Sequence, residues 1–155
     1  MTGRRKSGCL RPFCGRVLLE AVAVSYSNPS VSFAPTLVID IHGTAAKQLA
    51  EQLTHSGLTA DSADTCVEAR AAVRSQHYGA MVFLGDLSNL EDVRCIVELR
   101  KRAQRTWIIA ISSTGLPNAR QLHLGYGVDA QIVTPFSMED LLSRLVAFAR
   151  RSRPP

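Results

Sequence analysis

Short apolar runs alternate with segments of helical period from Thr36 to near the end of the chain. The runs are too short for core helices and are almost continuously apolar, as strands covered on both faces are. They occupy residues 37–39, 80–84, 107–111 and 130–133, with a weaker strand expected at residues 58–62. Strands that alternate with helices predict a parallel sheet with helices on both faces, because right-handed crossovers place them there.

Three of the predicted helices begin with a capping signal. In each, a hydroxyl residue is followed three positions later by an acid, which is typical of a capping box. The pairs are Thr65 with Glu68, Ser88 with Glu91, and Ser137 with Asp140. The first of these helices is expected to bury Val67, Ala71 and Val73.

Two further helices have other boundary signals. Residues 46–53 carry apolar side chains at helical spacing, and Gly57 follows as a stop. Pro117 is suited to the first turn of a helix that ends near residues 125–127. The chain therefore has five expected helices and five expected strands.

Length and charge indicate one domain with a basic arm. The 155 residues can bury a single substantial core. The net charge is +5, and residues 1–34 carry five basic side chains against one acid, so most of the excess lies there. We predict a disordered arm over residues 1–34 and a folded domain over residues 35–153. A basic nucleic-acid-binding face on the folded domain is not expected.

Cysteine spacing indicates no metal or redox motif. Cys9 and Cys14 lie in the arm, and Cys66 and Cys95 fall within helical patterns, so no Cys-x-x-Cys pair or Cys/His ligand set appears. We expect a reduced, cytoplasmic protein whose thiols are buried or idle. No apolar stretch is long enough to span a bilayer, and Glu20 interrupts the short apolar run that could suggest a signal peptide.

The end of the chain resembles the last strand, turn and helix of a response-regulator receiver domain. The resemblance is carried by residues 131–136 (QIVTPF) and 137–142 (SMEDLL), and it extends over about residues 36–150. It implies a flavodoxin-like, CheY-like fold with strand order 2-1-3-4-5. In such a sheet the functional crevice lies at the carboxyl ends of the strands.

The resemblance also assigns residues to the positions of the family's pocket. Asp40 matches the first residue of the acidic pair after strand one, and Ser112 matches the hydroxyl after strand four. The departures are Ile41 for the second acid, Leu84 for the phosphoacceptor aspartate, Thr134 for the lysine before Pro135, and Gln131 for the switching aromatic.

These departures predict a receiver without phosphorylation chemistry. Thr134 has neither the charge nor the reach to pair with a phosphorylated aspartate. Asp40, beside Ile41 and Leu84, offers one carboxylate where Mg²⁺ commonly uses several oxygens. We therefore expect no metal, no cofactor and no catalytic residue, so that the protein is not an enzyme.

The leading hypothesis is a stand-alone pseudo-receiver in bacterial signal transduction. It would act as a phosphorylation-independent protein-binding module whose partner is a signalling protein such as a histidine kinase or a regulator, and the resemblance also allows a homodimer. Gln131, Arg144 and Arg150 lie on the expected interaction surface. No membrane partner is expected.

Two alternatives remain open. Asp86 lies two residues after Leu84 and would point to the same side of a continued strand, which would give a phosphoaccepting single-domain regulator of a phosphorelay that uses Mg²⁺. A flavodoxin-like small-molecule binder would need a Gly-rich phosphate loop after strand one, where residues 41–44 (IHGT) stand instead.

The remaining basic residues carry a structural interpretation. His42 is expected to be a loop residue without a metal. The basic residues at 100–102 and at 105, like those at 150, 151 and 153, are expected to complement the dipoles of helix C-termini.

Overall fold

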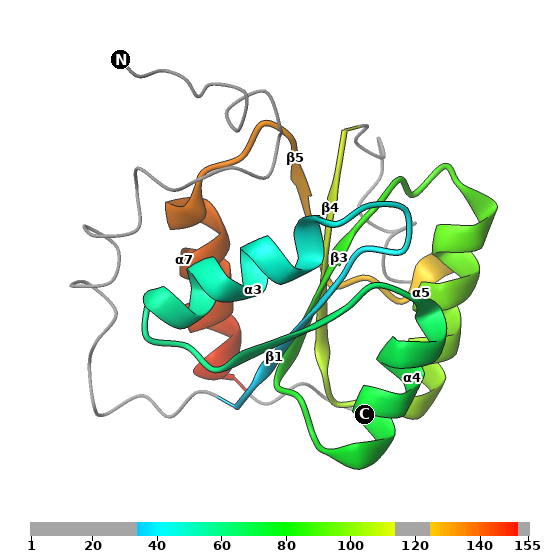
Figure 1. The fold of residues 1–155 in the computed structure, drawn as a ribbon, viewed down its shortest axis with the longest axis horizontal. Coiled ribbons are helices and arrows are strands. Elements are labelled where there is room, and N and C mark those ends of the chain that lie inside the picture. Colours follow the sequence, from blue (N-terminus) through cyan, green and yellow to red (C-terminus); the bar gives the residue numbers. More distant parts are fainter. Residues whose placement is uncertain (1–33, 114–124, 152–155) are drawn as a thin grey trace.

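A computed structural model of the chain describes residues 34–113 and 125–151 (Figure 1). The predicted helix that begins at Pro117 lies mostly outside these ranges, as do residues 1–33 of the predicted arm. Within the described ranges no helix is long and apolar enough to cross a membrane.

Five parallel strands form one sheet in the order β2-β1-β3-β4-β5. The strands are β1 Thr36–Ile39, β2 Ala60–Ala63, β3 Ala80–Leu84, β4 Trp107–Ser112 and β5 Ala130–Val133. The predicted fold class and strand order are confirmed, and β2 begins two residues later than expected.

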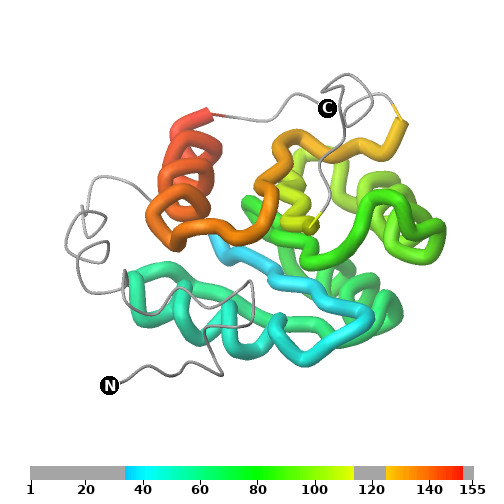
Figure 2. Tube along the Cα trace, turned by 90° about the horizontal axis from the view of Figure 1, so that it is seen from above, coloured from blue at the N-terminus to red at the C-terminus, as the bar shows by residue number. Residues whose placement is uncertain are grey.

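Helices cover both faces of this sheet. They are α3 Ala45–His55, α4 Cys66–Ser75, α5 Leu90–Arg102 and α7 Met138–Ala149. Figure 1 shows α3 and α7 on one face of the sheet and α4 and α5 on the other. The view from above in Figure 2 shows the same two layers, with the strands between them.

Successive residues of the middle strand, β3, pack on opposite faces of the sheet. In β3, Val82 and Leu84 pack into the core beneath α3 and α7, whereas Met81 and Phe83 pack into the core beneath α4 and α5. Every residue of β3 is buried. A strand covered on both faces must be apolar at successive positions, and burial of these side chains from water is the main force that stabilises the sheet.

Two of the three predicted caps are confirmed. The Thr65 hydroxyl accepts a hydrogen bond of 3.0 Å from the backbone N–H of Glu68, and the Ser137 hydroxyl accepts one of 3.0 Å from Asp140. Both satisfy an N–H group that the first turn of a helix leaves without an intrahelical acceptor.

The predicted cap at Ser88 is wrong. Asn89 caps α5 instead, because its side chain accepts a hydrogen bond of 2.8 Å from the backbone of Glu91. The hydroxyl of Ser88 donates to the Asp86 carboxylate at 2.8 Å. Ser88 and Asn89 are adjacent, and both are residue types that cap helices. The hydroxyl of Ser88 is used in the turn that begins at Asp86, so Asn89 caps the helix.

The predicted buried face of α4 is also wrong. Val67 is 64% exposed and Ala71 is exposed, whereas Ala69 is fully buried. Of the three residues expected to be buried, only Val73 packs against the core, and Cys66 packs against the same core. Small residues make several faces of this short helix similar in apolarity, so its period alone does not select the face that meets α5.

Arg100 joins the end of α5 to the starts of β4 and β5. Its guanidinium donates to the carbonyl oxygens of Thr106 at 2.7 Å and Gly127 at 2.8 Å, and to the carboxylate of Asp129 at 2.7 Å. Gly127 has φ +79°, and a Cβ there would lie 2.9 Å from Cγ of Arg100. Arg100 lies in the last turn of α5, as expected, and donates to the carbonyl oxygens of Ala103 and Gln104 just after the helix. Its largely buried charge is in addition paired with Asp129, which the sequence did not predict.

Candidate functional site

The carboxyl ends of the strands place four of the predicted residues at one edge of the sheet. Asp40 directly follows β1, Leu84 ends β3, Ser112 ends β4 and Thr134 directly follows β5. The strand register pairs Leu84 with Ile111, one residue before Ser112. The predicted pocket residues thus share the edge at which doubly wound proteins bind ligands.

Asp40 uses both carboxylate oxygens to hold the start of α3. Oδ1 accepts a hydrogen bond of 3.2 Å from the backbone of His42, and Oδ2 accepts one of 3.1 Å from Ala45, the first residue of the helix. A Cβ on Gly43 would lie 2.7 Å from Oδ2, so the loop closes tightly over the carboxylate. A carboxylate here is stabilised by the helix N-terminus.

Leu84 gives the end of β3 an apolar side chain. It is 1% exposed and belongs to the core beneath α3 and α7. The neighbouring Ile41 is partly buried against the opposite core. Neither side chain offers an oxygen to a phosphoryl group or a metal ion.

Ser112 and Gln131 contact each other across adjacent strands. The amide Nε2 of Gln131 donates to Oγ of Ser112 at 3.0 Å, and the backbone of Thr134 donates to the carbonyl oxygen of Ser112 at 2.9 Å. Ser112 is buried. The Thr134–Pro135 peptide bond is cis. Gln131 therefore forms a polar contact where the resemblance implies a movable aromatic ring.

The Asp86 side chain organises its own loop. Oδ1 accepts hydrogen bonds from the backbone and the hydroxyl of Ser88, at 2.9 and 2.8 Å. The backbone N–H of Asp86 donates to Oδ2 of Asp92 at 2.8 Å. This arrangement is an Asx-type turn that leads into α5.

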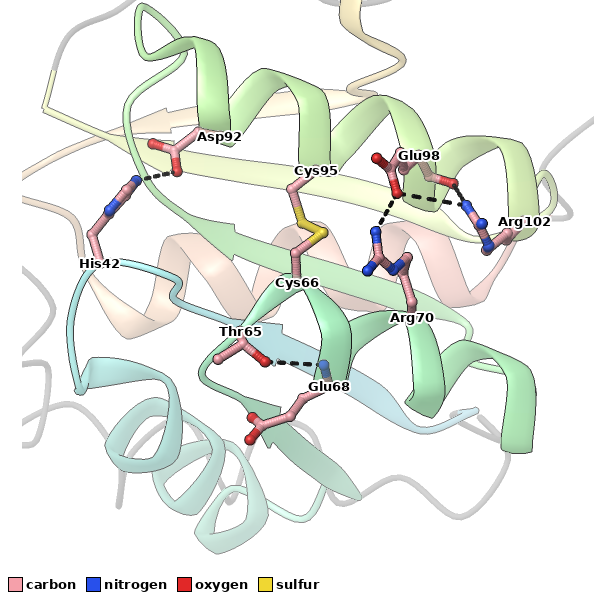
Figure 3. Close-up of a disulfide and its surroundings, with 9 residues drawn as sticks. All are labelled: His42, Thr65, Cys66, Glu68, Arg70, Asp92, Cys95, Glu98 and Arg102. Atoms are coloured by element: carbon pink, nitrogen blue, oxygen red, sulfur yellow. Dashed lines mark hydrogen bonds and ion pairs between the residues drawn. A yellow bond between two sulfur atoms is a disulfide. The ribbon is translucent and has the colours of Figure 1, made fainter.

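A contact between His42 and Asp92 was missed by sequence reasoning. Nε2 of His42 lies 2.9 Å from Oδ1 of Asp92, whose side chain is 1% exposed (Figure 3). Burial raises the pKa of Asp92 above its ordinary value of 3.8, and the hydrogen bond from Asp86 and the nearby His42 partly oppose this rise. His42 lies in the loop after β1, as expected, but the sequence did not predict its contact with Asp92. The available signal was the position of Asp92 on the buried stripe of α5, with Cys95, Ile96 and Leu99.

A disulfide joins Cys66 of α4 to Cys95 of α5, with the two Cα atoms 5.9 Å apart. The expectation of reduced thiols is therefore wrong for this pair. Both cysteines face the seam between the two helices, which no spacing rule within the chain could reveal. Further along the seam, Arg70 of α4 donates to Glu98 of α5, and this hydrogen bond lowers the pKa of Glu98.

The pocket residues do not fit a magnesium ion. In the described part of the chain, no group of three or more His, Cys, Asp or Glu side chains is placed to hold a metal. Both oxygens of Asp40 accept backbone N–H groups, and Leu84 has no oxygen to offer. Mg²⁺ requires several oxygen ligands in octahedral geometry.

A cavity of about 530 Å³ lies away from this edge, where α4 and α5 end. Arg74, Lys101, Arg102 and Arg105 line it, and none of the lining residues is an acid. Lys101, Arg102 and Arg105 were expected at a helix C-terminus, and Lys101 and Arg102 lie in the last turn of α5. Arg74, for which no expectation was stated, lies in the last turn of α4.

The sequence of this chain is similar to the sequences of bacterial regulatory proteins. No family model matches the chain. The chain is 30% identical over 128 residues to the transcriptional regulatory protein TcrA of Mycobacterium tuberculosis, covering 81% of this chain and 51% of the relative. It is 26% identical over 118 residues to the response regulator MprA of Mycobacterium avium, covering 76% and 52%. The chain thus spans about half the length of the curated relatives it matches.

Solved structures show the same fold. A two-component response regulator from Clostridium difficile aligns with a TM-score of 0.65 and 22% identity, covering 76% of this chain and 97% of that one. A CheY-like receiver domain protein from Methanospirillum hungatei aligns with a TM-score of 0.65 and 22% identity, covering 77% and 95%.

A third structure carries the metal that this site lacks the ligands to hold. The receiver domain of the sensor histidine kinase PA1611 from Pseudomonas aeruginosa, with a magnesium ion in its active-site cleft, aligns with a TM-score of 0.63 and 19% identity, covering 77% of this chain and 100% of that one.

The class of protein follows from these findings. The chain has the doubly wound parallel fold of CheY-like receiver domains, with a candidate site at the carboxyl ends of its strands. The chain resembles receiver domains in its fold and resembles response regulators in sequence over about half of their length.

Proposed function

We propose that this receiver domain belongs to a bacterial two-component system and acts there as a protein-binding module without accepting a phosphoryl group. The observation that carries the proposal is Leu84, an apolar and almost fully buried side chain at the position where the resemblance implies the phosphoacceptor. Phosphoryl transfer requires a nucleophilic atom in line with the phosphorus atom, and the side chain of leucine has none.

The surroundings of Leu84 support the same proposal. Asp40 is committed to the start of α3, so its oxygens are poorly placed to hold a metal that would neutralise a phosphate. Thr134 has no positive charge with which to pair with a phosphorylated residue. The site would therefore lack a nucleophile to accept the phosphoryl group, and it would lack a metal ion and a cation to stabilise the phosphorylated state.

The proposed binding surface includes β5 and α7. Val133 of β5 is a large apolar residue that is 48% exposed. Arg144 is half-buried and pairs with Asp140 one turn earlier at 3.5 Å, and Arg150 is exposed at the end of the helix. Exposed apolar residues and charged residues are both kinds of group that protein interfaces contain, which suits a protein partner such as a histidine kinase or another regulator.

Incubation with acetyl phosphate and Mg²⁺ tests the absence of phosphorylation. We expect intact-mass measurement to find no phosphate adduct, while a receiver that retains its aspartate, treated in parallel, gains one. An adduct that disappears in Asp86→Asn would contradict the proposal. It would favour the alternative, a phosphoaccepting regulator that uses Asp86 and Mg²⁺.

Pull-down from the native host with matched variants tests the binding surface. We expect Arg144→Glu and Arg150→Glu to reduce the recovered signalling protein, and Asp40→Asn to leave recovery nearly unchanged, because rim charges steer association while Asp40 lies in the pocket. If Asp40→Asn abolished recovery of the partner while Arg144→Glu and Arg150→Glu had no effect, the result would contradict the proposed surface. It would show that the pocket controls binding. Saturable binding of a small molecule at the strand edge would instead favour the flavodoxin-like alternative.

A further inference from the structure

The bridge between Cys66 and Cys95 closes a stretch of chain that contributes Leu84 to the candidate site. The two cysteines are 29 positions apart, and the segment between them contains α4, β3 and the loop that leads into α5. Leu84 and Asp86 both lie in this closed segment. The bridge therefore limits how β3 and α5 can move relative to α4.

The two sulfur atoms differ in access. Cys95 is 3% exposed within the core beneath α4 and α5, whereas Cys66 is partly exposed. Cys66 is also the first residue of α4, directly after the cap at Thr65. The N-terminus of a helix favours a thiolate, so Cys66 has the access and the environment of the reactive member of a pair.

One stripe of α5 carries three contacts at intervals of three residues. Asp92 contacts His42 of the loop after β1, Cys95 bonds to Cys66, and Glu98 accepts a hydrogen bond from Arg70. Figure 3 shows the three side chains in a row along α5. The covalent contact is the middle one, so opening it loosens the helix between its two polar contacts.

We propose that Cys66 and Cys95 form a reversible thiol–disulfide exchange site whose state sets the position of α5 and, through it, the contact between His42 and Asp92. The co-reactants are low-molecular-weight thiols and disulfides. This inference goes beyond the proposed function, because it gives a redox input to a module that has no phosphoryl input.

The exchange balances in two steps. To open the bridge, an external thiolate attacks Sγ of Cys66, forming a mixed disulfide and releasing the thiolate of Cys95. A second external thiolate then attacks the external sulfur of that mixed disulfide, releasing the Cys66 thiolate and one external disulfide. To close the bridge, the Cys66 thiolate attacks an external disulfide, which forms a mixed disulfide and releases one external thiolate. The Cys95 thiolate then attacks Sγ of Cys66 and displaces the second external thiolate.

The first experiment follows the redox state of the full-length chain. Cys9→Ser and Cys14→Ser remove the other two thiols, and the protein is equilibrated with stepped ratios of reduced to oxidised glutathione, alkylated and weighed. We expect a reversible two-electron transition between bridged and open chains. A bridge that resists excess reduced glutathione until the chain unfolds, or one that never forms in oxidised glutathione, would overturn the proposal.

Single variants in the same background test the assigned roles. In oxidised glutathione, Cys95→Ser should accumulate the mixed disulfide at Cys66, whereas Cys66→Ser should acquire several-fold less at the buried Cys95. Equal modification of the two variants, with circular dichroism confirming that both are folded, would contradict the order of attack.

The second experiment measures the coupling. Imidazole resonances of His42 are recorded by NMR in the bridged and the open chain, with His55 at the end of α3 as the internal control. We expect the His42 resonances to move between the two states and those of His55 to stay. The Cys66→Ser, Cys95→Ser double variant should match the open chain and ignore glutathione. His42 resonances that are identical in both states would reduce the bridge to a structural crosslink and overturn the coupling.

Discussion

Gln131 donates a hydrogen bond of 3.0 Å from Nε2 to Oγ of Ser112, joining β5 to β4 at the carboxyl edge of the sheet. Ser112 is buried and Gln131 is partly buried. The hydrogen bond holds the amide of Gln131 against Ser112. The pair therefore favours one resting arrangement of the edge, consistent with a constitutive binding module.

Removing the amide should weaken the fold measurably. We expect Gln131→Leu to lower the free energy of unfolding in urea by about 1 kcal/mol, because the hydrogen bond is lost while the bulk is kept. Ser112→Ala and the double variant complete the cycle. A coupling energy near zero would show that the two side chains contribute independently.

The buried carboxylate of Asp92 should make stability depend on pH. Its folded pKa is raised, so its contribution is full below 3.8, the ordinary value, and is lost as pH rises through the folded pKa. We expect the free energy of unfolding of the wild type, relative to Asp92→Asn, to fall as pH rises from about 3 toward neutrality.

The partner of Asp92 gives this prediction a control. His42 lowers the pKa of Asp92, so in His42→Gln the fall should occur at higher pH. Urea titrations at stepped pH measure both effects. A difference between wild type and Asp92→Asn that does not change with pH would contradict the assignment.

Arg100 and Lys101 offer a matched pair of adjacent basic residues. Arg100→Met should cost about 3 kcal/mol, because it leaves the buried carboxylate of Asp129 without its cation. Lys101 is exposed, and Lys101→Met should change stability by less than about 0.5 kcal/mol. Thermal and urea unfolding measure both variants. An equal loss of stability in Arg100→Met and Lys101→Met would show that the ion pair with Asp129 does not account for the effect of Arg100.

Trp107 reports the docking of α7 on the sheet. It is the chain's one tryptophan, and its ring stacks on Phe148 with centroids 4.2 Å apart and planes 4° apart. Phe148→Leu should change the tryptophan emission of the folded protein and cost about 1 kcal/mol from the lost ring pair. Tyr126→Leu, which alters the opposite core, should leave the emission unchanged.

The sequence by itself determined the layers of this protein. Continuous apolar runs at residues 80–84 and 107–111 could be stable only as strands covered on both faces, and the hydroxyl groups of Thr65 and Ser137 marked two helix starts. Local pattern is enough here, because each signal depends on neighbours a few positions away. The positions of Asp40, Leu84, Ser112 and Thr134 at one edge follow from the same strand pattern.

Only the tertiary structure decided which distant side chains meet. Cys66 bonds to Cys95, His42 contacts Asp92 and Arg100 pairs with Asp129, although the members of each pair are about 30 to 50 residues apart in the sequence. Such pairs depend on how far each helix is rotated on the sheet, and the misassigned face of α4 shows that small apolar residues leave this rotation open. Packing of the whole core fixes the rotation, because only one orientation fills the space between the helices and the sheet.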